Sequence, residues 1–135
     1  MKPKLAFTIS LLLICSVAFS QKQADLIGTW KLMSGKYTYH DTTLNYEQAN
    51  LNSIKIVTPT HFAVFSQGVN NTFEHALAGK VKFDSKNYTE SIEYGSAPSM
   101  LGSNMIFTYE LKGDNWHITG GANGYIFDEN WERVK

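Results

Sequence analysis

Short apolar and aromatic runs, separated by Gly, Asn, Asp, Ser and Pro, recur along the chain after residue 20. Runs of this length with alternating polar and apolar positions are typical of antiparallel strands, and the helical period is absent. The pattern predicts strands over residues 27–40, 52–58, 60–67, 73–83, 87–95, 104–112, 115–120 and 124–134. A helical turn is considered only within 44–51. The predicted fold class is all-β, in one domain spanning residues 21–135.

The connections between these strands alternate between tight turns and longer links. The tight turns are Pro59, Ser85-Lys86 and Gly113-Asp114, and the longer links are 41–51, 67–72, 95–103 and 120–124. Alternate links of an up-and-down meander lie at opposite ends, so the long links are expected to form a mouth and the tight turns a floor. Eight strands close into a barrel that encloses side chains or one small ligand. We therefore expect a single eight-stranded antiparallel up-and-down β-barrel, with a two-sheet sandwich as the alternative.

The tight turns also predict which side chains face the lumen, because residues opposite each other on paired strands share a face. The Ser85-Lys86 turn places Glu90 opposite Val81 and Tyr94 opposite Leu77. The candidate ligand-binding residues on the inward face are His75, Tyr88, Glu90, Tyr94, Phe107, Tyr109, Tyr125 and Glu129. A buried carboxylate is costly unless it is paired or hydrogen-bonded, so Glu90 is the interior charge that most needs an explanation.

Other residues are expected on the outer face. A turn centred on Pro59 places Ile54 and Ile56 inside, and it leaves Lys55, Val57 and His61 outside. By the Gly113-Asp114 turn, His117 lies opposite Glu110 on the outer surface as a cross-strand pair.

An N-terminal leader precedes the strand pattern. Lys2 and Lys4 supply positive charge, residues 5–19 are mostly apolar, and small residues precede a cleavage site at Ser20/Gln21. These features predict a signal peptide over residues 1–20 and a secreted or periplasmic protein. The apolar run is too short for a transmembrane helix.

Composition narrows the possible functions. The 12 basic and 12 acidic residues give no electrostatic argument for binding nucleic acid. The one cysteine, Cys15, lies in the leader, and the bulky Ile14 before it argues against lipoprotein acylation. The histidines have no metal-ligand spacing, so we expect no metal or cofactor. A monomer is expected.

The first and last strands carry a recognisable pair of motifs. Gly28-Thr29-Trp30 opens the first strand, and Trp131-Glu132-Arg133 ends the last. This resembles the lipocalin and wider calycin pattern, in which a Trp of the first strand packs against an Arg of the last. The resemblance implies that Gly28, Trp30 and Arg133 close the barrel floor, where a desolvated guanidinium over an indole contributes about 1–2 kcal/mol.

A closer resemblance is to small secreted lipocalin-like domains of Bacteroidetes-type bacteria. It is carried by residues 27–32, 56–63, 88–94 and 131–135. The resemblance implies a barrel that binds a small molecule, and it supplies no catalytic residues.

The sequence is compatible with three functions. The first is binding of a small apolar or amphipathic molecule in the lumen, because apolar walls with a few polar groups are typical of such pockets. The second is an adaptor that binds protein or glycan through its loops or exterior. The third is an isomerase or cyclase with Glu90 and His75 as acid and base, although roughly 20 Å of strand separates them. Apolar residues of the long links could close the mouth: Leu44, Tyr46, Leu51, Met100 and Leu101.

Overall fold

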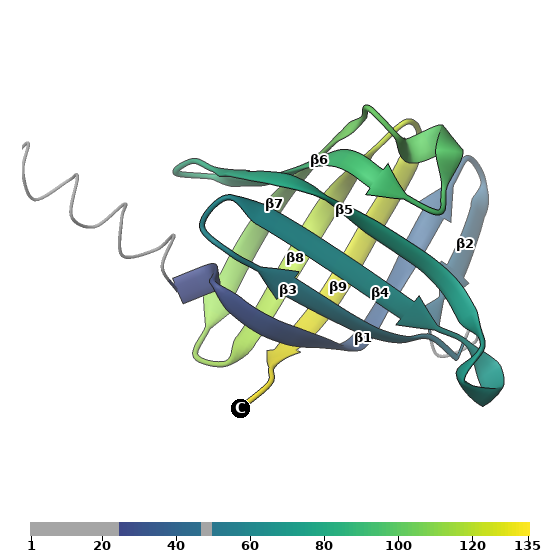
Figure 1. Ribbon diagram of the computed structural model, residues 1–135, viewed down its shortest axis with the longest axis horizontal. Coiled ribbons are helices and arrows are strands. Elements are labelled where there is room, and N and C mark those ends of the chain that lie inside the picture. The colour runs from purple at the N-terminus through teal and green to yellow at the C-terminus, as the bar shows by residue number, and fades with distance from the viewer. Residues whose placement is uncertain (1–24, 47–49) are drawn as a thin grey trace, which may run out of the picture.

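A closed antiparallel β-barrel forms the body of the computed structural model, which describes residues 25–46 and 50–135 (Figure 1). In chain order the strands are β1 (Gly28–Tyr39), β2 (Thr42–Asn45), β3 (Asn52–Val57), β4 (His61–Gln67), β5 (Phe73–Phe83), β6 (Asn87–Gly95), β7 (Asn104–Lys112), β8 (Asn115–Ala122) and β9 (Tyr125–Arg133). Pairing of β1 with β9 closes the barrel, and β2 is an additional strand on β1. The predicted all-β barrel is confirmed. The expected signal peptide, residues 1–20, lies outside the described residues.

β2 replaces part of the helical turn considered for residues 44–51. Thr42–Asn45 pairs with the end of β1 through a two-residue turn at His40 and Asp41. His40 adopts a positive φ of 52°, which a tight hairpin of this kind requires. The β-branched Thr42 and Thr43 favour an extended backbone over a helical one, so the strand continues beyond the turn.

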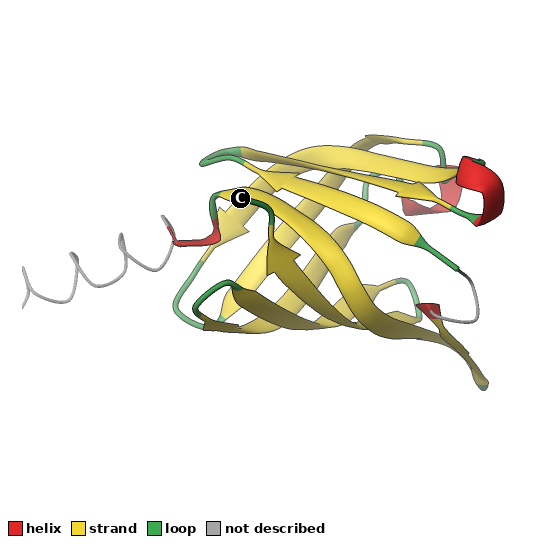
Figure 2. Cartoon of the chain, turned by 90° about the horizontal axis from the view of Figure 1, so that it is seen from below, coloured by secondary structure: helices red, strands yellow, loops and turns green. Residues whose placement is uncertain are grey.

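The two ends of the barrel differ as the loop lengths predict, with one exception. Both 3-10 helices, η1 (Val69–Asn71) and η2 (Pro98–Met100), lie at the end opposite the C-terminus, together with the β1–β2 hairpin (Figure 2). The exception is the link between β8 and β9, which is a two-residue turn because β8 continues to Ala122. Asn123 and Gly124 both have positive φ, as a type I′ turn requires.

Most of the predicted hairpin register is correct. The Ser85-Lys86 turn pairs Phe83 with Tyr88 and Val81 with Glu90, and the Gly113-Asp114 turn pairs Leu111 with Trp116. The inward face of these strands is therefore as expected over most of its length.

Two departures in register change which side chains face the lumen. Val57 pairs with Phe62, because the turn is centred between Pro59 and Thr60 and not on Pro59 itself. This one-residue difference buries Lys55 and Val57 and leaves Ile54 and Ile56 exposed, the reverse of the prediction.

The second departure is a bulge in β6. Gly79 pairs with Ile92 but Ala78 pairs with Tyr94, so Glu93 is the extra residue. The bulge turns Tyr94 to the outside, where 70% of its surface is exposed, and its expected inward orientation is wrong.

The floor is closed by aromatic and cationic side chains. The Arg133 guanidinium lies 4.2 Å from the centroid of the Trp30 ring and donates a 3.0 Å hydrogen bond to the carbonyl of Ile27. The Trp30 indole donates a 3.0 Å hydrogen bond to the carbonyl of Leu26. A Cβ on Gly28 would stand 2.7 Å from Arg133 Nη1, so glycine is required for this close approach. Trp30 and Leu26 are fully buried.

No helix among the described residues has the length and apolar character needed to span a membrane.

Candidate functional site

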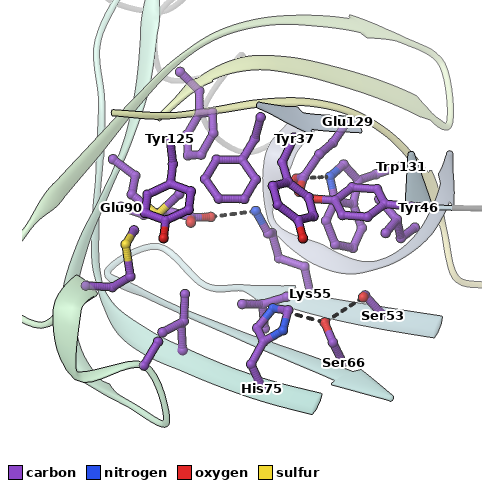
Figure 3. A pocket seen from close by; sticks show the side chains of 18 of the residues that line it. Tyr37, Tyr46, Ser53, Lys55, Ser66, His75, Glu90, Tyr125, Glu129 and Trp131 are labelled. Carbon is purple, nitrogen blue, oxygen red and sulfur yellow. Dashed lines mark hydrogen bonds and ion pairs between the residues drawn. The ribbon is translucent and has the colours of Figure 1, made fainter. Parts of the chain in front are cut away.

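A cavity of about 290 Å3 occupies the barrel between its centre and the mouth (Figure 3). Most of its wall is apolar, and side chains from opposite sides of the barrel contribute to it. The apolar residues are Leu32, Val64, Leu77, Ala97, Met100, Met105, Phe107, Phe127 and Trp131. The polar residues are Tyr37, Tyr46, Ser53, Lys55, Ser66, His75, Glu90, Ser99, Tyr125 and Glu129. An apolar cavity with several convergent polar groups is the usual form of a small-molecule site.

A buried ion pair lies in this cavity. The Lys55 ammonium on β3 is 2.7 Å from Glu90 Oε1 on β6, and both side chains are only 3% exposed. The Tyr88 hydroxyl donates a second hydrogen bond, of 2.8 Å, to the same oxygen. The ammonium also lies 4.9 Å from the centroid of the Trp131 ring and 5.6 Å from that of Phe107. The ion pair with Lys55 therefore offsets the cost of burying the Glu90 carboxylate.

A second carboxylate, Glu129 on β9, is 8% exposed and has neutral partners. Its Oε1 accepts a 2.7 Å hydrogen bond from the Tyr46 hydroxyl, and its Oε2 accepts one of 2.9 Å from the Trp131 indole. Burial raises the pKa of Glu129, and the nearby Lys55 charge and these hydrogen bonds oppose that rise only in part. Burial and Glu129 together also raise the pKa of the Tyr46 hydroxyl.

The position of Tyr46 depends on a glycine. A Cβ on Gly35 would lie 2.5 Å from the Tyr46 ring, and Gly35 pairs directly with Glu129 across β1 and β9. The ring can therefore lie against the β1 backbone and direct its hydroxyl to the carboxylate.

A chain of hydrogen bonds runs along the opposite wall. Ser53 and Ser66, both buried, are linked by a 2.6 Å hydrogen bond between their hydroxyls. Ser66 is in turn 3.2 Å from Nε2 of His75 on β5. Burial lowers the pKa of His75, although the charge of Glu74 opposes this, so the neutral imidazole is favoured.

Five aromatic side chains form a continuous row from the mouth to Glu129, which we call the aromatic row. Tyr39 stacks on Tyr125 at a centroid distance of 4.1 Å, and Tyr125 is 6.3 Å from Phe127. Phe127 is 6.2 Å from Tyr37, which is 5.9 Å from Tyr46. The rings of the row other than Tyr39 line the cavity on the side of β1 and β9, and the Tyr39 ring extends the row outward from Tyr125.

The structure brings most of the predicted inward residues to one place. His75, Glu90, Phe107, Tyr125 and Glu129 all line the cavity. The inward position of Glu90 and Phe107 follows from the hairpin registers that the turns predicted.

The other predicted inward residues lie elsewhere. Tyr88 is fully buried and contacts Glu90 without lining the cavity. Tyr109 is partly buried and lines a separate hollow near the floor with Ser85 and Lys86. Tyr94 is on the outer surface because of the bulge in β6.

Sequence reasoning missed several residues of the site: Tyr37, Ser53, Lys55 and Ser66, with Tyr46 considered only as a loop residue. The inward position of Lys55 could have been found from a different turn. Pro59 and Thr60, flanked by Thr58 and His61, can form a two-residue turn, and that register places Lys55 inside. That turn is closed by a 2.8 Å hydrogen bond from the amide of Thr58 to the carbonyl of His61. No pattern in the sequence indicates that Tyr46 reaches Glu129.

The other histidines lie outside the lumen. His61 is exposed as predicted. His117 is also on the outer face and lies opposite Glu110 as predicted, but its ring bonds Asp128 at 2.8 Å, and the Glu110 carboxylate forms an ion pair with Lys112. Over residues 25–46 and 50–135, no three His, Cys, Asp or Glu side chains gather as metal ligands.

The loop residues expected at the mouth differ in their positions. Met100, in η2, is buried and lines the cavity, whereas Leu44 and Leu101 are exposed. Of these three, Met100 is the one that covers the lumen.

Comparison of the chain with protein-family models, curated protein sequences and solved structures finds no match.

Proposed function

We propose that this chain is an exported lipocalin-like protein, of the type found in small secreted domains of Bacteroidetes-type bacteria, that binds a small apolar or amphipathic molecule in its lumen. The observation that carries this proposal is the cavity of about 290 Å3 inside a closed barrel. Its walls supply apolar surface, and burial of a ligand there removes roughly 25 cal/mol of unfavourable free energy per Å2 of apolar surface.

The polar groups of the cavity have hydrogen-bonding capacity left for a ligand. An ammonium has three N–H donors, and one of those on Lys55 is directed to Glu90. The Tyr37 and Tyr125 side chains reach into the cavity from the β1 and β9 side (Figure 3). A ligand with one polar end and an apolar body matches this distribution.

The proposal is tested by titrating the protein with the neutral fluorescent probe N-phenyl-1-naphthylamine. Ala97 lines the cavity, so Ala97→Phe is expected to fill it and to weaken probe binding at least about tenfold. Ala63→Phe adds the same ring on the outer face of β4 and is expected to leave binding unchanged. Equal affinity of the wild type and Ala97→Phe would contradict binding in the lumen.

Export is tested separately. The protein recovered from the periplasm or the medium is expected to begin at Gln21. Recovery of the intact leader in the cytoplasm would contradict export.

The barrel exterior supports a second candidate, an adaptor for protein or glycan. Ile54 and Phe65 are cross-strand neighbours on the outer face, and the Phe65 ring lies 5.5 Å from that of Phe73. All three are exposed. If this face binds a partner, Phe65→Ser weakens that binding and leaves probe binding in the lumen unchanged.

A further inference from the structure

The ionisable side chains of the cavity do not pair one to one. Lys55 contributes one positive charge, and Glu90 and Glu129 contribute two carboxyl groups. His75, on the opposite wall, has a pKa that burial lowers, so it favours its neutral form. The lumen therefore holds one carboxyl group more than its cation can match.

Lys55 is committed to one of these carboxylates. Among the described residues, Glu90 is its only acidic partner within 4.0 Å, at 2.7 Å. Glu129 is held instead by the Tyr46 hydroxyl and the Trp131 indole, which donate hydrogen bonds but carry no charge. Glu129 is thus the carboxyl group of the cavity without a cation against it.

The approach to Glu129 also favours a positive charge. The aromatic row leads from Tyr39 at the mouth to Tyr46, whose hydroxyl contacts the carboxylate. The faces of aromatic rings attract cations, by about 0.5–2 kcal/mol for each well-placed ring. An anion entering along the same path gains none of this attraction, and Glu129, which has no cation against it, lies at its end.

We propose that the ligand of this cavity carries a cationic polar end, such as a primary or quaternary ammonium, on an apolar body, and that Glu129 binds this end. The inference rests on the proposed function, since it requires that the lumen binds a small molecule. It adds the charge class of that molecule: the cation is preferred over a neutral head, and the neutral head over an anion.

The test is competition against bound N-phenyl-1-naphthylamine with three compounds of equal chain length: octylamine, 1-octanol and octanoate. At neutral pH they carry a positive charge, no charge and a negative charge. We expect octylamine to displace the probe at a concentration at least about tenfold lower than octanoate does, with 1-octanol between them. Octanoate binding as tightly as octylamine would overturn the charge assignment while leaving binding in the lumen intact. Failure of the probe and of all three compounds to bind would overturn the proposed function itself.

The role of Glu129 is tested with Glu129→Gln, which keeps its shape and cannot ionise. The variant is expected to lose most of the preference for octylamine over 1-octanol and to bind 1-octanol as the wild type does. Glu110→Gln removes an exposed carboxylate outside the barrel and serves as the matched control. An unchanged preference in a folded Glu129→Gln would assign the selectivity elsewhere and contradict the inference. Should this variant fail to fold, the order of the three compounds on the wild type still decides the proposal.

Discussion

Two cations of this barrel lie over indole rings, one at the floor and one in the lumen. Arg133 lies 4.2 Å from the Trp30 ring, and Lys55 lies 4.9 Å from the Trp131 ring. The Arg133 side chain is 25% exposed and bonds the backbone carbonyls of Ile27 and Asp25. Lys55 is only 3% exposed and bonds a buried carboxylate.

The difference separates closure of the barrel from its binding chemistry. At the floor, two backbone carbonyls and the partly exposed carboxylate of Asp114, 3.4 Å from Arg133 Nε, contact the guanidinium, and the packed rings complete the wall. In the lumen, the ammonium pairs with the buried carboxylate of Glu90, and Lys55 lines the cavity. Changes at the floor should therefore alter stability alone, whereas changes in the lumen should alter both stability and binding.

The largest expected effect is that of Lys55→Met. Removal of the ammonium leaves Glu90 buried without its cation, so the free energy of unfolding should fall by about 3–5 kcal/mol. Urea denaturation measures the loss. Lys80→Met is the matched control, because Lys80 pairs with Glu93 at 3.1 Å on the exposed surface and should contribute less than about 1 kcal/mol.

A double variant checks that cause. Lys55→Met combined with Glu90→Leu removes both charges, so it should be more stable than Lys55→Met alone. A double variant that is less stable would show that Lys55 contributes through packing and not through its pairing with Glu90.

The next effect is at the floor. Gly28→Ala places a methyl group 2.7 Å from Arg133 Nη1 at a position with φ of 147°, so it should cost about 2–3 kcal/mol. Gly102→Ala is the control, since Gly102 also has positive φ but no atom lies within 4 Å of its added Cβ. The control should cost about 1 kcal/mol. Weakened probe binding in a folded Gly28→Ala would contradict the separation of floor and lumen.

Tyr46→Phe is expected to have a smaller effect. It removes one of the hydrogen bonds to buried Glu129, which should lower stability by about 1–2 kcal/mol. Tyr94→Phe loses a hydroxyl on the outer surface and should change stability by less than about 0.5 kcal/mol. Thermal denaturation of the two variants measures the difference. Equal stability would exclude a structural contribution from the Tyr46 hydroxyl.

The smallest effect is a change in the pH dependence of stability. The pKa of Glu129 is raised in the folded state, so the protonated form contributes stability below its usual pKa of about 4.5. That contribution is lost as the pH rises through the raised value. The stability of the wild type relative to Glu129→Gln should therefore fall with rising pH across this range. Lys55, Glu90 and Tyr46 face Glu129 and are present in both proteins.

Two acidic groups with lowered pKa values do not affect the difference in stability between the wild type and Glu129→Gln. Backbone amides of Lys86 and Asn87 lower the pKa of Asp84, and Lys135 lowers that of Asp114. Both carboxylates occur in the wild type and in Glu129→Gln, so their effect cancels in the difference. A difference that rises with pH would contradict the raised pKa of Glu129.

The barrel could be predicted from the sequence because its strands and tight turns are determined by residues that are close together along the chain. Alternation of apolar residues predicted the strands, and the turns at Ser85-Lys86 and Gly113-Asp114 predicted their register. The inward position of Glu90 and Phe107 followed from these turns.

The rest of the site could not be predicted in this way, because each missing residue depends on a small shift in register or on a distant contact. A one-residue error at Pro59 moved Lys55 to the wrong face, and the apolar Ile54 and Ile56 favoured that error. The bulge at Glu93 leaves no apolar or turn signal, so Tyr94 was placed inside. The Tyr46 hydroxyl contacts Glu129 although 83 residues separate the two in the sequence.

Binding of a small molecule in the lumen above a closed floor can be followed by nuclear magnetic resonance of the indole N–H groups. Trp131 lines the cavity, whereas the Trp30 indole bonds Leu26 at the floor. Addition of saturating 1-octanol is expected to shift the Trp131 resonance and to leave that of Trp30 in place. A spectrum in which neither resonance moves, or in which Trp30 moves as much as Trp131, would contradict the account.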